Sequence, residues 1–338
     1  MTLSSAGKSQ LHRVDHHWRQ VLKQAMRKPA ELLEQLQLDP QLLNGIEAGQ
    51  RQFPLLAPPA FVQQIEKGNP EDPLFLQIFP QAAESLPPKD LLKDPVGDLA
   101  SQGSTALLHK YHSRALIITT GACAIHCRYC FRRHFPYSSN SGHRLDWQHT
   151  LKYIEQHPNI SEIILSGGDP LMLPTQQLHK ITQQLSTLPQ ITTLRIHTRM
   201  ATCLPERFNT ALLAWLKNLP FRLVLVHHIN HPNEISEPAT KVIFRLKPLI
   251  QQQLNQSVLL ASVNNNVQTL KHLSELLFTN NILPYYLHQM DRVTSAGHFI
   301  CSDHEATKIV TELRASLPGY LVPKLVREEA GKSSKTPI

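Results

Sequence analysis

The stretch ALIITTGACAIHCRYC, residues 115–130, joins a short apolar run to three closely spaced cysteines. The run 115–120 is rich in β-branched residues, which is typical of a buried strand. Cys123, Cys127 and Cys130 follow it with the spacing Cys-x3-Cys-x2-Cys. Parallel β/α sheets carry their functional groups in the loops that follow the strands. We therefore expect this stretch to open an α/β unit that carries chemistry at its end.

The same pattern recurs along the chain. Further short apolar runs rich in β-branched residues are each followed by a polar turn, and amphipathic segments such as PTQQLHKITQQLSTL lie between them. Alternating strands and helices predict parallel strands joined by right-handed crossovers. No Gly-x-Gly-x-x-Gly follows the first strand, so we expect a partial (β/α)6, TIM-like barrel and not a Rossmann sheet. The expected strands occupy residues 115–120, 162–168, 193–199, 222–230, 257–263 and 283–289.

The first hundred residues have a different character. WRQVLKQAM and PAELLEQLQL show helical apolar spacing, and FPLLAPPAF and SLPPKDLLKDP are connectors broken by proline. Nothing in this region gathers polar groups for chemistry, so we expect it to be a helical cap. We divide the chain into a helical N-terminal region (1–105), the barrel (106–318) and a C-terminal segment (319–338).

Composition indicates a folded soluble protein, because 41% of the 338 residues are hydrophobic and 18% are charged. The sequence has no apolar run of transmembrane length, and its N-terminus lacks the apolar core of a signal peptide. We expect a cytoplasmic protein that does not bind a membrane. The net charge is +8, but the basic residues are scattered, so nothing indicates DNA as a partner.

The three clustered cysteines favour metal or redox chemistry over disulfides. A 4Fe–4S cluster normally takes four cysteines, so three leave one iron with an open coordination position. Alternatives are a zinc site completed by His126 or His134, or three incidental cysteines. Cys203 and Cys301 have no partner spacing, and we expect them to be buried or incidental thiols.

CAIHCRYC after ALIITTGA resembles the signature Cys-x3-Cys-x-aromatic-Cys of the radical S-adenosylmethionine (SAM) superfamily. The resemblance implies a 4Fe–4S cluster on the three cysteines, with SAM bound to its open iron. Reductive cleavage of SAM by an external electron donor would then give a 5′-deoxyadenosyl radical. The residues that the resemblance assigns to SAM are Tyr129, Ser166, Gly167, Gly168 and Asp169, with Asn233 as a further contact.

The rest of the chain resembles the lysine 2,3-aminomutase family, through FRRHFPY, LSGGDPLM, LRIHTR, NHPNEI, PYYLHQMD and SKTP in that order. The resemblance implies pyridoxal phosphate (PLP) as a cofactor. Lys335 in GKSSKTPI matches the lysine that binds PLP covalently, and Lys332 is the competitor. By the same match Arg114 and Tyr111 bind PLP, and Arg132 binds the substrate carboxylate.

Two aspartates hold the substrate's ε-ammonium group in the family's free-lysine enzymes. This chain has Asn265 and Glu328 at the positions that we match to them, although Asn264, Asn266 or Glu329 could shift that register. One negative charge still favours a cationic side chain, so lysine is the expected substrate.

The resemblance implies an isomerase that converts (S)-α-lysine into (R)-β-lysine through the 5′-deoxyadenosyl radical and a PLP aldimine. Within the family the sequence resembles the branch that supplies (R)-β-lysine for modification of elongation factor P. That branch implies a functional link to elongation factor P and its β-lysine ligase, in a monomer or weak oligomer. The alternatives are an enzyme that makes free β-lysine for other pathways, or a non-catalytic metal-binding module that contacts RNA.

Overall fold

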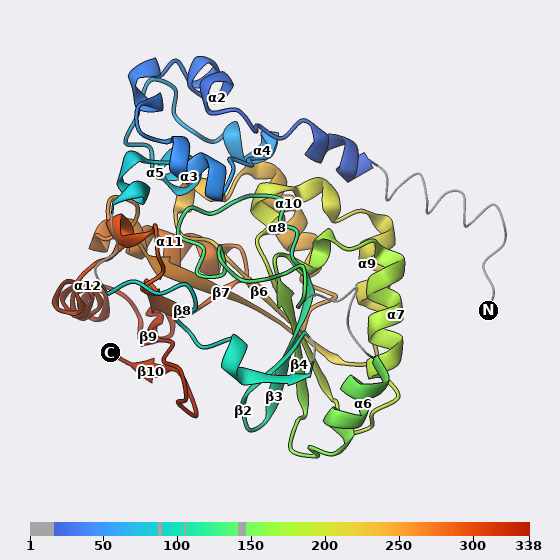
Figure 1. Ribbon diagram of the computed structural model, residues 1–338. Helices are drawn as coiled ribbons and strands as arrows, with labels where there is room; N and C mark the ends of the chain where they lie inside the picture. The colour runs from blue at the N-terminus through green and yellow to red at the C-terminus, as the bar shows by residue number, and fades with distance from the viewer. Residues whose placement is uncertain (1–16, 87–89, 105, 141–146) are drawn as a thin grey trace.

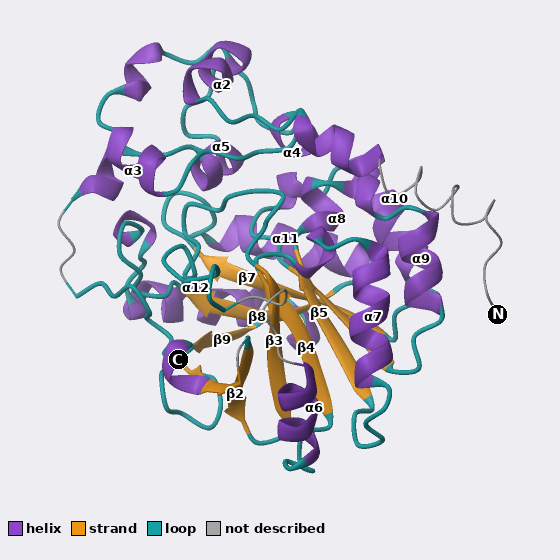
Figure 2. Ribbon diagram, turned by 45° about the vertical axis from the view of Figure 1, so that its right-hand side comes forward, coloured by secondary structure: helices purple, strands orange, loops and turns teal. Residues whose placement is uncertain are grey.

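A computed structural model describes residues 17–86, 90–104, 106–140 and 147–338. Parts of the predicted N-terminal region (1–16, 87–89 and 105) therefore lie outside the described residues. Residues 17–86 of the N-terminal region form short helices and connectors, grouped at one end of the sheet in both views (Figures 1 and 2), and the region ends in a short strand, β1 (Gln102–Ser104). A helical segment at 17–23 precedes α2 (Pro29–Leu36), α3 (Glu47–Gln52), α4 (Pro59–Val62) and α5 (Pro73–Ile78).

Helix α5 shows why these short helices form. Asp72 precedes it, and its carboxylate accepts hydrogen bonds from the backbone N–H groups of Leu74 and Phe75. Pro73 occupies the first helical position, where a missing N–H removes no hydrogen bond. The helix buries its apolar face, and with it the polar side chain of Gln77.

In the described part of the chain, ten strands form one mixed sheet whose order follows the chain. Strands β3 to β9 are parallel, and the pairs β1–β2, β2–β3 and β9–β10 are antiparallel. The strands are β1 (Gln102–Ser104), β2 (Leu107–Tyr111), β3 (Arg114–Thr120), β4 (Glu162–Gly167), β5 (Thr193–Thr198), β6 (Arg222–His227), β7 (Gln252–Leu259), β8 (Leu283–Gln289), β9 (Lys324–Arg327) and β10 (Thr336–Pro337).

Helices join the parallel strands and pack against the sheet (Figure 2). They are α6 (Trp147–Glu155), α7 (Thr175–Leu185), α8 (Met200–Cys203), α9 (Thr210–Lys217), α10 (Glu237–Leu246), α11 (Val267–Thr279) and α12 (Asp303–Ser316). The α/β class with a mixed sheet is confirmed. The closer description, a partial (β/α)6 barrel with a helical cap, stays a prediction.

Side-chain alternation along the strands separates the core from the site. On β5, Leu194 and Ile196 are fully buried in the main hydrophobic core. Arg195 and His197, the residues between and after them, line a cavity on the other face. The strands therefore carry an apolar face toward the helices and a polar face toward the cavity.

The expected strands agree with β3, β4, β5, β6 and β8, and the remaining strands differ from the prediction. Strand β7 begins at Gln252, five residues before the predicted 257–263, because its burial alternates along a polar stretch that the search for apolar runs missed. Strands β1, β2, β9 and β10 were not expected. Strand β1 lies in the region predicted to be helical, and β9 and β10 join the predicted C-terminal segment 319–338 to the sheet. No helix among the described residues is both long enough and apolar enough to cross a bilayer.

Candidate active site

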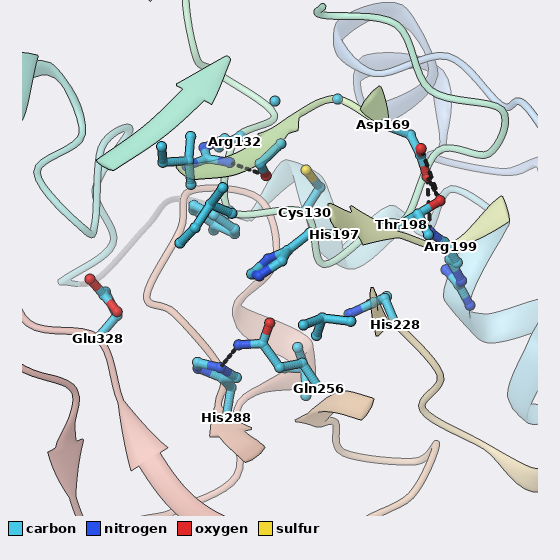
Figure 3. A pocket seen from close by; sticks show the side chains of 18 of the residues that line it. Cys130, Arg132, Asp169, His197, Thr198, Arg199, His228, Gln256, His288 and Glu328 are labelled. Atoms are coloured by element: carbon cyan, nitrogen blue, oxygen red, sulfur yellow. Dashed lines mark hydrogen bonds between the residues drawn. The ribbon is translucent and has the colours of Figure 1, made fainter. Parts of the chain in front are cut away.

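The carboxyl ends of the parallel strands surround a cavity of about 330 Å³ (Figure 3). Parallel strands end at the same edge of a sheet, so the loops that follow them meet there. Residues from β3 to β8, the cysteine loop, and Glu328 and Lys335 near the C-terminus all contribute to the lining. The cavity therefore unites segments that are more than two hundred residues apart in the chain.

All three clustered cysteines, Cys123, Cys127 and Cys130, line this cavity. The N-terminal region holds the loop that carries them, because the backbone N–H of Arg128 donates to the carbonyl oxygen of Gln77 at 2.9 Å. Soft sulfur donors on a cavity wall are the ligands that iron–sulfur clusters take. The residues present therefore fit the predicted cluster.

A zinc site completed by a neighbouring histidine does not fit the geometry. His126 Nδ1 bonds the carbonyl oxygen of Pro54 at 2.7 Å, and His134 Nε2 lies 3.3 Å from that of Thr294. Neither histidine lines the cavity. Nowhere in the described ranges do three His, Cys, Asp or Glu side chains gather closely enough for a single metal ion. A cubane cluster spreads its cysteines over separate irons and needs no such gathering.

A buried ion-pair triad also fixes the cysteine loop. Arg128 Nε donates to Glu84 Oε1 at 2.7 Å, and Arg133 Nη2 donates to Glu84 Oε2 at 2.7 Å. The three side chains have 0% exposure. Burial acts to raise the pKa of Glu84, but the two guanidiniums outweigh it and hold the pKa below its ordinary value. The N-terminal region therefore contributes Glu84 to the support of the cysteine loop, although the sequence indicated no polar groups for chemistry there.

The glycine segment after β4 passes close to the cysteine loop. A Cβ atom at Gly168 would lie 2.3 Å from the carbonyl oxygen of Ala122, and one at Gly167 would lie 2.5 Å from that of Thr120. Gly167 also has a φ of 123°, which other residues rarely adopt. Only glycine fits these two positions, so the segment brings bare backbone to the cavity beside the cysteines.

Asp169, which ends this segment, uses its carboxylate within the protein. It accepts hydrogen bonds from the N–H of Leu171 at 3.0 Å, Thr198 Oγ1 at 2.8 Å and the N–H of Arg199 at 2.9 Å (Figure 3). Burial raises the pKa of Asp169 to about 6, although these hydrogen bonds act to lower it. Its carboxylate ties the loop after β4 to the end of β5.

Tyr129 is buried, and its ring lines the cavity. Its hydroxyl group lies 2.8 Å from His228 Nε2 and accepts hydrogen bonds from Asn230 Nδ2 at 2.7 Å and Arg199 Nη1 at 3.0 Å. These partners fix the ring on the wall, so its face and not its hydroxyl group is available to a ligand.

At the other end of the cavity, Lys335 Nζ donates to Glu328 Oε2 at 2.8 Å. The antiparallel pair Thr336–Arg327 sets this contact, because Lys335 precedes β10 and Glu328 follows β9. The C-terminal segment therefore belongs to the sheet and is not the exposed tail that composition alone favours. Lys332, the competing lysine, is exposed and does not line the cavity.

Glu328 has a second close partner. The hydroxyl group of Tyr111 donates to Glu328 Oε1 at 2.6 Å, and the guanidinium of Arg114 lies over the Tyr111 ring at 4.1 Å. Burial acts to raise the pKa of Glu328, but Lys335 and Tyr111 outweigh it and hold the pKa below its ordinary value. Lys335 and Tyr111, two of the residues predicted to hold PLP, thus both bind this carboxylate, and the third, Arg114, packs on Tyr111.

A chain of alternating charges connects the two ends. Arg132 Nε donates to Asp98 Oδ2 at 2.7 Å, and Lys110 Nζ lies 2.7 Å from Asp98 Oδ1. Lys110 Nζ also lies 3.8 Å from Glu328 Oε1, and Glu328 binds Lys335. The predicted carboxylate-binding arginine is therefore linked through Asp98 and Lys110 to the predicted PLP lysine.

A sequence profile of the Radical SAM superfamily matches residues 117–251. The L-lysine 2,3-aminomutase of Escherichia coli (strain K12) is 44% identical over 95% of this chain and 94% of that protein. The L-lysine 2,3-aminomutase of Haemophilus influenzae is 43% identical over 96% of this chain and 96% of that protein. The L-lysine 2,3-aminomutase of Clostridium subterminale is 30% identical over 95% of this chain and 77% of that protein.

The chain belongs to the L-lysine 2,3-aminomutase family. Membership confirms the expectation of an enzyme, a radical SAM isomerase, and sets aside the non-catalytic RNA-contacting module. It also implies the three expected cofactors: a 4Fe–4S cluster, SAM and PLP. The residues that hold each cofactor in this aminomutase stay predictions.

Two predicted site residues do not reach the cavity of the aminomutase. Asn233 is exposed, and its backbone N–H donates to His231 Nδ1 at 3.2 Å. Asn265 donates through Nδ2 to Glu305 Oε1 at 2.8 Å on helix α12. The register alternatives also lie outside the cavity lining: Asn264 and Asn266 beside Asn265, and Glu329 beside Glu328.

The second carboxylate near Lys335 is Asp291, which sequence reasoning did not single out. It lines the cavity, and burial raises its pKa to about 7 although Lys335 acts to lower it. Asp291 is the last residue of the segment HQMD and lies two residues after the end of β8. Its place at the end of a predicted strand is the signal that could have identified it.

Three histidines at or just after the ends of strands β5, β6 and β8 also form one wall of the cavity, which sequence reasoning missed. His197, His228 and His288 line the cavity, and burial lowers the pKa of each, that of His228 to about 3 (Figure 3). His288 Nε2 lies 2.8 Å from Gln256 Nε2. Neutral imidazoles offer hydrogen bonds to a ligand without adding positive charge to this wall.

Proposed function

We propose that this enzyme converts (S)-α-lysine into (R)-β-lysine. The observation that carries the proposal is that one cavity is lined both by the cysteine triplet and by Lys335. A SAM-derived radical and a lysine-bound cofactor can act on one substrate only if their binding residues share such a space. In this proposal the sheet forms the wall of a partial (β/α)6 barrel, and the N-terminal helices form its cap.

The cofactors divide between the two ends of the cavity. Cys123, Cys127 and Cys130 would hold the cluster, with Tyr129 and the backbone of residues 166–168 beside SAM. Lys335, Arg114 and Tyr111 would hold PLP. When bound, these groups supply a carbon-centred radical and a π-system that accepts an unpaired electron. The protein contributes binding, orientation and exclusion of water around them.

The substrate would lie along the chain of charges. Arg132 has five N–H donors, and Asp98 and Ser166 take two of them, so the guanidinium can still bind the substrate carboxylate. Glu328 and Asp291 would bind the ε-ammonium group, since both line the cavity near Lys335. Asp291 replaces Asn265 in this role, because the side chain of Asn265 lies outside the cavity lining.

Glu328 can exchange one cation for another during this reaction. Its Oε2 atom accepts from Lys335 Nζ at 2.8 Å. If Lys335 holds PLP through Nζ, Glu328 no longer pairs with a free lysine ammonium group there. The substrate's ammonium group can then take the same place, which keeps the buried carboxylate paired.

The test is anaerobic incubation of the reconstituted protein with SAM, PLP, a reductant and α-lysine, followed by chromatography for β-lysine. We expect β-lysine from the native chain and from Lys332→Ala, and none from Cys127→Ala or Lys335→Ala. Cleavage of SAM with unchanged lysine would contradict the substrate assignment and leave the radical chemistry standing.

We further propose that the β-lysine serves modification of elongation factor P, with a separate ligase and an external electron donor as functional partners. The resemblance of the sequence to that branch of the family supports this role. Mass spectrometry of elongation factor P from cells without this gene tests it. An unchanged β-lysyl modification would favour the alternative, free β-lysine for another pathway.

A further inference from the structure

Arg199 touches a predicted cluster ligand directly. It follows β5, and its Nη1 lies 2.8 Å from the sulfur atom of Cys127. No role in the proposed reaction has been given to this residue. The guanidinium is buried, with 6% exposure, and it lies over the ring of Phe61 at 4.9 Å.

Other side chains hold the guanidinium in this position. Its Nη2 donates to Gln77 Oε1 at 2.7 Å and to Glu234 Oε2 at 2.9 Å. Glu234 has 0% side-chain exposure and accepts hydrogen bonds from the backbone N–H groups of Asn230 and His231. The α5 helix and the loop after β6 thus fix Arg199 against Cys127.

A charged donor on one thiolate has consequences for the cluster. Reduction adds one electron from an external one-electron donor, so the cluster and its thiolates become one unit more negative. Hydrogen bonds to cluster sulfurs and nearby charges set the potential of that step. An arginine stays protonated in proteins, so its positive charge at Cys127 favours the reduced state.

We propose that Arg199 is a positioning residue that raises the reduction potential of the cluster through its hydrogen bond to Cys127. Glu234 fixes this guanidinium and offsets part of its charge. Arg199 therefore makes electron uptake easier before SAM is cleaved. This inference rests on the cluster assignment in the proposed function.

The test is a redox titration of the reconstituted full-length protein, followed by electron paramagnetic resonance, after iron and sulfide have been measured. We expect Arg199→Gln to lower the ratio of reduced to oxidised cluster about tenfold at a fixed potential, which is about 59 mV for one electron. Arg199→Lys keeps the charge and should shift the potential less. Glu234→Gln should shift it in the opposite direction, because the charge of Arg199 is then less balanced.

Arg207→Lys is the matched control. Arg207 is a buried arginine that donates to the carbonyl oxygens of Leu171 at 2.6 Å and Leu173 at 3.0 Å. Its replacement should leave the potential unchanged. An unchanged potential in Arg199→Gln, or shifts of the same sign in Arg199→Gln and Glu234→Gln, would overturn the inference.

The outcomes also separate this inference from the proposed function. A native chain that assembles no cluster overturns both. A native chain that cleaves SAM, with potentials that Arg199 and Glu234 do not affect, overturns only the role of Arg199. If the Arg199→Gln protein assembles no cluster, the role of Arg199 is decided by the other two variants. The signs of the shifts in reduction potential in Arg199→Lys and Glu234→Gln then support or overturn it.

Discussion

The two ends of the cavity balance their charges in different ways. At the cysteine end, Glu84 and its two arginine partners have 0% side-chain exposure, so no ion or solvent can replace them. At the lysine end, Lys335 and Glu328 are 19% and 13% exposed. The first arrangement suits a cofactor that must stay in one place. The second suits a lysine that must release its partner in order to bind PLP.

The largest effect is expected when one carboxylate is replaced at each end of the cavity. Glu84→Gln leaves two buried guanidiniums without their charge partner, and we expect the free energy of unfolding to fall by about 3–5 kcal/mol. Glu328→Gln breaks a pair that solvent reaches, and we expect a loss on the order of 1 kcal/mol. Urea denaturation followed by circular dichroism measures both. Equal losses would mean that the two ends are equally rigid.

The next test concerns substrate binding at the lysine end. Asp291→Asn removes one of the two carboxylates proposed for the ε-ammonium group. A hydrogen bond to a charged group contributes about 1.5–3 kcal/mol, so kcat/KM for lysine should fall about 10- to 100-fold. Asn265→Asp is the control, because Asn265 faces Glu305 outside the cavity, and it should leave kcat/KM unchanged. The reverse result would restore Asn265 as the substrate contact.

The two ends should also respond to pH with opposite slopes. The pKa of Asp291 lies at about 7, above its ordinary 3.8, so the folded state binds this proton more tightly than the unfolded state. The native chain therefore loses stability as the pH rises from about 4 through 7. Asp291→Asn removes that loss and should be more stable than the native chain at pH 8, on the order of 1–2 kcal/mol. Near pH 4 the two should agree.

Glu84 has a lowered pKa, so its contribution is complete above its ordinary value of 4.5 and disappears as the pH falls through the lowered value. The loss of stability in Glu84→Gln, relative to the native chain, should therefore become smaller as the pH falls. The gain of stability in Asp291→Asn should become larger as the pH rises. Denaturation at several pH values measures both slopes. If the stability differences of both variants changed with pH in the same direction, the proposed contrast between the two ends would be wrong.

The smallest expected effect comes from Tyr111→Phe. The change removes the hydroxyl group that donates to Glu328 and keeps the ring beneath Arg114. One hydrogen bond contributes about 0.5–1.5 kcal/mol, so the Kd for PLP should rise about 2- to 10-fold in an absorbance titration. Iron content should not change. A loss of iron would mean that the two ends do not act separately.

Local sequence predicted much of the site because its chemistry lies in short segments. The spacing of the cysteine triplet and the two glycines at 167 and 168 indicated residues that the structure brings to one cavity. Lys335 came only from the family resemblance, through its place before Thr-Pro, and it lies on the cavity wall whereas Lys332 does not. In each case the chemistry depends on neighbours within a few residues.

Prediction failed where a position depends on residues far along the chain. Asn265 and Asn233 follow the expected strands, but Asn265 bonds Glu305, Asn233 is exposed, and neither lines the cavity. Glu84 and Asp98 lie in a region without a recognisable motif. Their partners, Arg128 and Arg132, are more than thirty residues away, and only the fold brings them together.

The sequence by itself determined the alternation of strands and helices, the family, and the residue types that can hold metal and cofactor. These follow from periodicity and from spacing along the chain, which are local properties. Only the tertiary structure decided which carboxylates share the cavity and which arginine touches Cys127. A buried charge is stable only with a partner of opposite sign, and whether that partner is within reach depends on packing between distant segments.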